Sequence, residues 1–304
     1  MSAPVALFVY NRPDHTAETL SALRANSGCS DTDLFIFSDA PKSAGQAPQV
    51  EEVRALCRQV AGFRSVTIVE REVNWGLAKS IVEGVTSVVE RFGRVIVLED
   101  DLVTSPAFLA FMNQALDQYE AESKVWHVSG WSYPIDHVGS DDAFLWRGMN
   151  CWGWATWADR WSYFEKDPAE LVKAFNWRQR RDFDLGGTQV FWPQVTQNVK
   201  GRINTWAIFW YATIFRRGGL CLNPKVSFVT NIGHDGSGVH CGTSDIDQAR
   251  SLNTKTGIRL PSSVTENGHA VSAIRSYYIA QRRPIWVRVI NKLSRMLIKK
   301  NIVK

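Results

Sequence analysis

The stretch RVIVLEDDLVTSPAF, residues 94–108, runs from branched apolar residues into three consecutive carboxylates, Glu99, Asp100 and Asp101. A continuous apolar run is typical of a strand that is buried on both faces of a sheet. Adjacent carboxylates at the end of such a strand repel one another unless a cation compensates them. Because Mg²⁺ and Mn²⁺ are held by one or two carboxylates together with phosphates and waters, the stretch predicts a metal-bound diphosphate site, with a solvated acidic turn as the alternative.

The chain before this stretch repeats one pattern of apolar run, polar break and helix-period segment. The apolar runs lie at 5–10, 34–37, 66–69 and 95–98. Helices are expected between them, near 14–26, 48–61 and 77–92. Strands that alternate with helices in this way predict an α/β fold with a mostly parallel sheet and helices on both faces.

In such sheets ligands bind beyond the carboxyl ends of the strands. The residues that follow each run are therefore the first candidates for a site. They are Asn11 and Arg12, Ser38 and Asp39, Asn74 to Gly76, and the three carboxylates.

After residue 105 the pattern changes, and tryptophan becomes frequent: 11 of the 13 tryptophans lie between Trp126 and Trp210. The elements expected here are a helix at 106–120, a strand at 125–131, a helix at 205–219 and a strand at 225–230.

Charge is unevenly spread along the 304 residues, which carry a net +5. From Arg275 to Lys304 there are nine Lys or Arg and no acid, so 26 basic residues face 30 acidic ones in the rest of the chain. The basic balance therefore belongs to the tail and does not favour a nucleic-acid partner. Residues 284–304 have the spacing of a basic amphipathic helix, for which an anionic membrane surface is the favoured partner. Docking on a partner protein and packing on the body are the alternatives.

Other features narrow the class of protein. The five cysteines are odd in number and lack C-x-x-C spacing, which predicts reduced thiols in the cytoplasm. No run reaches the roughly 18 apolar residues that a membrane-spanning helix needs. No G-x-S-x-G occurs, and no G-x-G-x-x-G follows the first strand.

Five segments together resemble one known group of enzymes. They are VYNRPDHTAETLSAL, FIFSDAPK, NWGLAKSI, VIVLEDDLVTSPAFLAFM and LWRGMNCWGWATW. In this order they are similar to the nucleotide-sugar-dependent glycosyltransferases of the GT-A fold, and most of all to N-acetylglucosaminyltransferase I-like and related bacterial sugar transferases. The likeness spans roughly residues 5–160 and continues more weakly to about 242.

The resemblance implies a Rossmann-like GT-A sheet, a divalent cation (Mn²⁺ or Mg²⁺) and a nucleotide-sugar donor, with uridine as the family-level expectation. It also implies a glycan or lipid-linked acceptor and a role in cell-surface polysaccharide or lipopolysaccharide synthesis at the inner face of the cytoplasmic membrane. The chain then divides into a nucleotide-sugar-binding half (1–105), an acceptor-binding and catalytic half (106–245), a linker (246–283) and the basic tail (284–304).

The resemblance also assigns roles to residues of the donor site. Asp101 matches the direct metal ligand, and Glu99 and Asp100 match residues that brace the metal, ribose or diphosphate. The remaining donor-site matches are Asn11 and Arg12 for the nucleotide, Asp39 for the base, and Trp75, Gly76 and Lys79 for the segment that closes over the nucleoside. For Asp39, a turn residue before Pro41 is the alternative.

The GMNCWGW segment matches the loop that flanks donor sugar and acceptor. Exposed indole faces suit the apolar patches of sugar rings, although most tryptophans serve as core. The residues expected to touch the acceptor are Trp131, Trp152, Gly153 and Trp154.

An inverting transfer needs a general base for the acceptor hydroxyl, and a carboxylate usually serves. The family places this base near the start of a helix after a tryptophan, where Ala207 stands here. The substitutes are Asp235, His234 and Asp142, with Asp141 beside it; His240 is expected to complete the metal shell. Because alanine cannot accept a proton, a non-catalytic carbohydrate- or nucleotide-binding protein that keeps the fold is the alternative to a metal-dependent hexosyl- or N-acetylhexosaminyltransferase.

Overall fold

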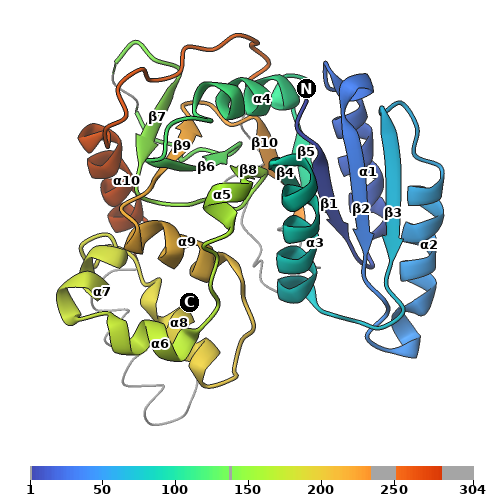
Figure 1. Cartoon of the computed structure of the whole chain (residues 1–304), viewed down its shortest axis with the longest axis horizontal. Helices are drawn as coiled ribbons and strands as arrows, with labels where there is room; N and C mark the ends of the chain where they lie inside the picture. Colours follow the sequence, from blue (N-terminus) through green and yellow to red (C-terminus); the bar gives the residue numbers. More distant parts are fainter. Residues whose placement is uncertain (1, 137–138, 234–250, 283–304) are drawn as a thin grey trace.

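The computed structural model describes residues 2–136, 139–233 and 251–282, and its centre is one eight-stranded sheet (Figure 1). In spatial order the strands are β3 (Ser65–Glu70), β2 (Asp33–Ser38), β1 (Val5–Val9), β4 (Arg94–Glu99), β8 (Trp154–Trp157), β6 (Val125–Ser129), β9 (Leu220–Pro224) and β7 (Ala143–Trp146). A second sheet pairs β5 (Leu102–Thr104) with β10 (Val229–Asn231).

Some of the described helices cover the sheet, and others form a small lobe beside it. They are α1 (Pro13–Arg24), α2 (Ala47–Arg58), α3 (Leu77–Phe92), α4 (Phe108–Gln118), α5 (Ala158–Trp161), α6 (Pro168–Ala174), α7 (Trp177–Phe183), α8 (Trp192–Val199), α9 (Ala207–Arg216) and α10 (Gly268–Ala280). Two 3₁₀ turns, η1 (Cys29–Asp31) and η2 (Ala44–Gln46), lie in the first half.

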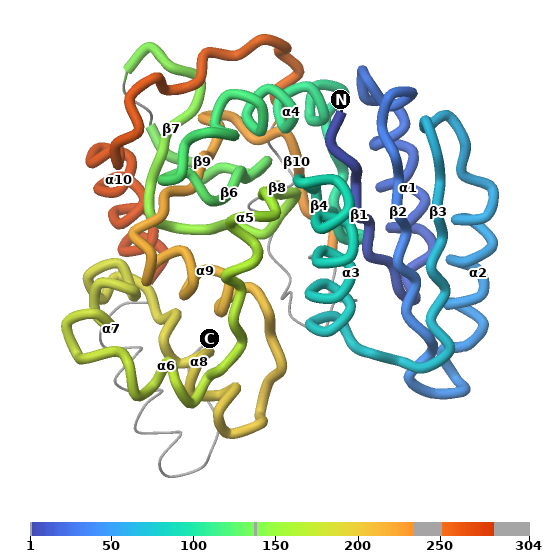
Figure 2. Tube along the Cα trace, in the orientation of Figure 1, coloured from blue at the N-terminus to red at the C-terminus, as the bar shows by residue number. Residues whose placement is uncertain are grey.

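The first half of the sheet has the predicted doubly wound arrangement. Strands β3, β2, β1 and β4 are all parallel, and the first strand of the chain lies inside the sheet between the second and the fourth, as the trace in Figure 2 shows. The predicted α/β fold is confirmed, and each of the four expected strands and three expected helices of this half forms within a few residues of its predicted range.

Alternation along β1 explains why both faces of the sheet are covered. Val5, Leu7 and Val9 belong to the core under α1, α2 and α4, whereas Ala6 and Phe8 belong to the opposite core under α3. Every residue of β1 is buried, because helices lie on both sides of it.

The second half is antiparallel where it joins the first. Strand β8 runs antiparallel to both β4 and β6, and β7 closes the far edge antiparallel to β9. Helices α6 to α9 share a separate aromatic core and form the lobe at the lower left of Figure 1.

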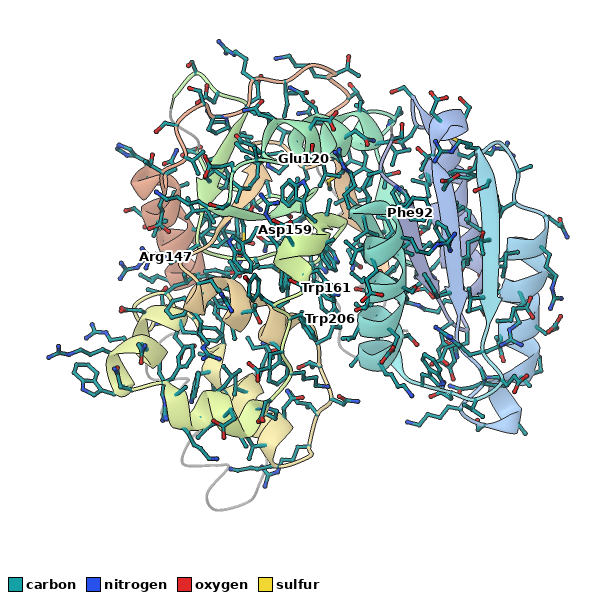
Figure 3. All side chains as sticks on the ribbon, viewed as in Figure 1. Phe92, Glu120, Arg147, Asp159, Trp161 and Trp206 are labelled. Carbon is teal, nitrogen blue, oxygen red and sulfur yellow. The ribbon has the colours of Figure 1, made fainter. Side chains whose placement is uncertain are left out.

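Tryptophans fill the core where the two halves meet. The fully buried Trp154 ring stacks on Trp206 at 5.2 Å between centroids and packs against Trp161 at 5.6 Å. Trp161 and Trp206 lie close together beside α5 in Figure 3. Most of the tryptophans in this part of the chain are therefore structural.

The expected linker at 246–283 differs in the structure, because its described part, 251–282, packs on the body. The Gln114 amide donates to the Ile258 carbonyl at 2.7 Å, and the Tyr119 hydroxyl donates to the Pro261 carbonyl at 2.6 Å. Ile274 of α10 is fully buried. The polar composition of this segment gave no indication that its few apolar residues, Ile258, Leu260 and Ile274 among them, are buried in the core.

The predicted tail helix at 284–304 lies outside the described residues. Among the residues that are described, none of the helices has the length and apolar composition needed to span a membrane.

Gly84 sets the distance between α3 and the sheet. A Cβ atom at Gly84 would lie 2.6 Å from the Phe8 ring, whereas one at Gly268, the first residue of α10, would meet nothing within 4 Å. We expect Gly84→Ala to lower the free energy of unfolding by about 1–3 kcal/mol through overpacking, even though alanine favours helices. Gly268→Ala is the matched control and should be neutral or stabilising in urea unfolding. Equal effects of the two substitutions would contradict close packing at Gly84.

Candidate functional site

The carboxyl ends of β1, β2 and β4 bring the predicted donor-site residues to one edge of the sheet. Phe8 is in register with Glu99, and Val9 with Ser38, so the residues that follow these strands are neighbours. The expectation that the strand ends converge is confirmed for Arg12, Asp39 and the three carboxylates.

Arg12 lies between two of the carboxylates. Its Nη2 donates to Asp100 Oδ1 and, at 3.0 Å, to Asp101 Oδ2. Burial acts to lower the pKa of Arg12, but the Asp100 and Asp101 carboxylates outweigh burial and raise it. The guanidinium is therefore the counter-charge of the cluster.

Asp100 and Asp101 have different surroundings. The Asp100 carboxylate also accepts from the Tyr10 amide at 3.2 Å, and its carbonyl accepts from Thr19 Oγ1 at 2.9 Å, so it ties β4 to β1 and α1. The Asp101 carbonyl accepts from the Ile232 amide at 2.9 Å. Gly233 lies against the Asp101 side chain, where an added Cβ would be 2.4 Å from Oδ2. Only a glycine fits this approach without displacing the carboxylate.

Glu99 is the carboxyl group with the most perturbed proton affinity. Burial, followed by the Asp101 and Asp100 charges, raises its pKa to about 8. Burial also raises the pKa of Asp100, against the opposing effect of Arg12. One guanidinium thus leaves the three carboxyl groups with uncompensated negative charge.

The donor chemistry of this cluster suits a hard divalent cation, because Mg²⁺ and Mn²⁺ commonly use one or two carboxylates and complete their shell with phosphates and waters. Asp101 and Glu99 are the residues that would hold the ion. Within residues 2–136, 139–233 and 251–282, no group of three or more His, Cys, Asp or Glu side chains is arranged to hold a metal. His240, the third predicted ligand, lies outside the described residues.

Asp39 anchors the segment that was expected to close over the nucleoside. Its Oδ1 accepts from the amides of Ala40 at 2.9 Å and Trp75 at 2.8 Å, and its Oδ2 accepts from the amide of Gly76 at 2.8 Å. The carboxylate therefore fixes the turn that begins α3, which neither the predicted role nor its alternative as a turn residue before Pro41 anticipated. Recognition of a base by Asp39 stays a prediction.

The Trp75 indole lies between strand β3 and helix α3 in sequence and is approached by two cations. Arg71 lies 3.7 Å and Lys79 lies 4.2 Å from the ring centroid. Trp75 is partly buried, and both cations lie over its ring near the edge where β2 and β3 end. Asn11, the other predicted donor residue, is half-buried after β1.

The predicted acceptor loop begins beside the carboxylates. Val97 of β4 pairs with Trp154, so Gly153 and Trp152 lie level with the end of β4. Trp152 is partly exposed and meets Trp131 edge to face at 5.1 Å. Trp154 is fully buried and has no surface to offer an acceptor, which corrects its predicted role. Of the three predicted indoles, Trp131 is also buried and Trp152 is the most exposed; contact of Trp152 with a sugar stays a prediction.

A buried polar network that the sequence did not reveal holds this loop. The Asn150 carbonyl accepts from His127 Nε2 at 2.9 Å, and the Asn150 side chain bonds Tyr133 Oη at 3.1 Å and Asn223 at 3.0 Å. The Trp210 indole donates to His127 Nδ1 at 3.2 Å, which fixes the neutral tautomer. Tyr133 in turn bonds Tyr278 of α10 at 2.7 Å.

The general base is not identified by the described residues. Ala207 is the first residue of α9 and follows Trp206, as the resemblance implied. Asp142 lies at the start of β7, four strands from β4, and accepts from the Arg259 amide at 2.8 Å and from Lys255 at 3.2 Å. Asp235 and His234 lie outside the described residues. All three stay predictions, and Asp142 is not brought to the carboxylate cluster.

No protein-family model matches the chain. Among solved structures, the chain is similar to S. aureus TarS 1–349 (TM-score 0.42, 8% identity, 74% of this chain and 59% of that one). It is also similar to the mannosyltransferase PcManGT from Pyrobaculum calidifontis in complex with GDP-Man and Mn²⁺ (TM-score 0.36, 14% identity, 72% and 70%). A third is mouse xyloside xylosyltransferase 1 in its apo form (TM-score 0.37, 10% identity, 71% and 82%). The chain spans less than two thirds of the first of these structures.

His127 predicts a specific acid sensitivity. Burial lowers its pKa to about 3, whereas an unfolded histidine titrates near 6.5. Between these values the unfolded state binds the extra proton, so stability should fall as pH falls from about 6.5 towards 3. His127→Gln should flatten the pH dependence of the free energy of unfolding by about 1.4 kcal/mol per pH unit in this range.

Urea unfolding at several pH values measures this slope. His269→Gln, at an exposed position of α10, is the control and should keep the wild-type slope. An unchanged slope in His127→Gln would show that another group carries the acid sensitivity.

Proposed function

We propose that the chain is a metal-dependent glycosyltransferase that moves a sugar from a nucleotide-diphosphate donor to a glycan or lipid-linked acceptor. The observation that carries this proposal is the group formed by Arg12 and three carboxyl groups at the carboxyl end of β4, inside a doubly wound sheet. Open α/β sheets bind their ligands at this edge, beside the strand where the order reverses.

In this proposal the residues at the edge of the sheet have separate roles in binding the donor and the acceptor. Arg12 binds the diphosphate, since a guanidinium presents a fork of donors that matches phosphate oxygens. Trp75, held by Asp39, covers the nucleoside, for which we keep uridine as the expectation. Trp152 contacts the sugar of the donor or acceptor.

A divalent cation held by Asp101 and Glu99 would neutralise charge on the leaving diphosphate. The transfer also needs a base that takes the proton of the acceptor hydroxyl, and we keep Asp235, His234 and Asp142 as its candidates. The proposed reaction is a hexosyl or N-acetylhexosaminyl transfer with inversion, in the synthesis of a cell-surface polysaccharide or lipopolysaccharide.

Ala207 favours one second candidate, a binding protein that retains donor recognition and lacks transfer. It stands at the first position of α9, where a carboxylate is expected from the resemblance and a methyl group cannot accept a proton. The two proposals share donor binding and differ in donor turnover, so hydrolysis or transfer of a bound nucleotide sugar separates them.

Asp101→Asn tests the shared site. Calorimetric titration with a panel of nucleoside diphosphates and nucleotide sugars, each with and without Mn²⁺, should show Mn²⁺-dependent binding of one nucleotide class to the wild type. In Asp101→Asn we expect this binding to weaken by tenfold or more, ~1.4 kcal/mol, because a ligand to the cation is lost.

Asp117→Asn on the exposed face of α4 removes a carboxylate away from the site and should bind like the wild type. If the wild type binds no member of the panel, the donor site is refuted. If Asp101→Asn binds as tightly as the wild type, the assigned ligand is wrong.

A further inference from the structure

We propose that Arg12 makes cation binding conditional on the donor: the guanidinium closes the carboxylate cluster to a divalent ion until a diphosphate draws it away. This inference rests on the donor site proposed above and concerns the order and coupling of its ligands. It gives Arg12 a second task besides binding phosphate.

The geometry places the guanidinium on one carboxylate oxygen of Asp101, the residue proposed above as a ligand of the cation. One nitrogen, Nη2, bonds both Asp100 Oδ1 and Asp101 Oδ2. Gly233 lies close to both side chains, because an added Cβ would be 2.4 Å from Asp101 Oδ2 and 3.0 Å from Arg12 Nη1. Because Arg12 Nη2 already occupies Asp101 Oδ2 and Gly233 leaves little space beside the pair, an ion that takes this oxygen would have to displace Arg12.

Asp100 holds Arg12 in this position. Its second oxygen is engaged by the Tyr10 amide, and its carbonyl is engaged by Thr19, so the carboxylate has a fixed orientation towards Arg12. The side chain of Asp100 is 5% exposed and that of Arg12 is 19% exposed. The acid is therefore the fixed partner, and the partly exposed guanidinium is the partner that can move.

A diphosphate offers Arg12 an alternative anion of higher charge. Contacts of arginine with phosphate are charge-assisted and frequently bidentate, so the guanidinium loses little when it leaves Asp101 for the diphosphate. Movement of Arg12 would then free Asp101 Oδ2, which could serve as a ligand to the cation. Coupling of this kind is reciprocal, so the ion must strengthen diphosphate binding by the factor by which the diphosphate strengthens ion binding.

Arg12→Gln tests the proposal in the full chain. Mn²⁺ is titrated into the protein without nucleotide, and the free ion is followed by electron paramagnetic resonance. The matched control is Arg64→Gln, since Arg64 forms a comparable pair with Asp33 at the opposite end of β2, where Arg64 Nε donates to Oδ1 at 2.8 Å.

Arg12→Gln should bind nucleotide-free Mn²⁺ about fivefold or more tightly than the wild type, while Arg64→Gln should not. Uridine diphosphate should raise Mn²⁺ affinity in the wild type and raise it less in Arg12→Gln. Arg12→Lys keeps the positive charge and serves as a second variant in case Arg12→Gln misfolds. Without nucleotide, Arg12→Lys should bind Mn²⁺ as weakly as the wild type does. Mn²⁺ alone should also raise the melting temperature of Arg12→Gln more than that of the wild type, because the ion replaces the missing counter-charge.

Equal or weaker nucleotide-free Mn²⁺ affinity in Arg12→Gln overturns the gating role. The donor site itself survives that result if Mn²⁺-dependent nucleotide binding persists in the wild type and is lost in Asp101→Asn. If no variant binds Mn²⁺ with or without uridine diphosphate, both the gating role and the cation site of the proposed function are refuted.

Discussion

The pairing of Arg12 with Asp100 and Asp101 ties the first strand of the sheet to the fourth at the edge where the candidate site lies. Removing one member of a buried ion pair leaves the other charged and desolvated, which is costlier than never forming the pair. The Arg12 guanidinium is therefore needed at this edge to stabilise the two buried carboxylates. At the same edge, Gly233 and the turn held by Asp39 bring backbone close to the carboxylates of Asp101 and Asp39.

Sequence reasoning was accurate where the pattern is local. The runs that became β1 to β4 are mostly apolar and are followed by polar residues, so both the strands and their shared edge could be predicted. The second half of the fold was harder to predict from the sequence. Strands β7, β8 and β9 have only four or five residues each. They are packed by tryptophan, a residue that is found in helices, strands and cores alike.

At the site, too, the residues that could be predicted are those marked by a local sequence pattern. The carboxylates could be found because they are consecutive, and Arg12 because it follows a strand. The role of Asn150 could not, since its partners Tyr133 and Asn223 are 17 and 73 residues away and the GMNCWGW segment does not indicate them. Trp154 shows the converse error: its neighbours in the sequence suggest a sugar-binding loop, whereas its position in β8 directs the indole into the core.

The bond between Tyr133 and Tyr278 connects α10 to the loop that carries Trp152. The second half of the fold therefore includes α10, although the sequence predicts that this half ends at residue 245. Truncation before Gly268 would remove the Tyr278 hydroxyl, which bonds Tyr133. A protein shortened in this way would differ from the full chain in the loop that carries Trp152 as well as in its tail. A protein cut after α10 would keep that hydroxyl, and any change in its behaviour could then be ascribed to the residues beyond the helix.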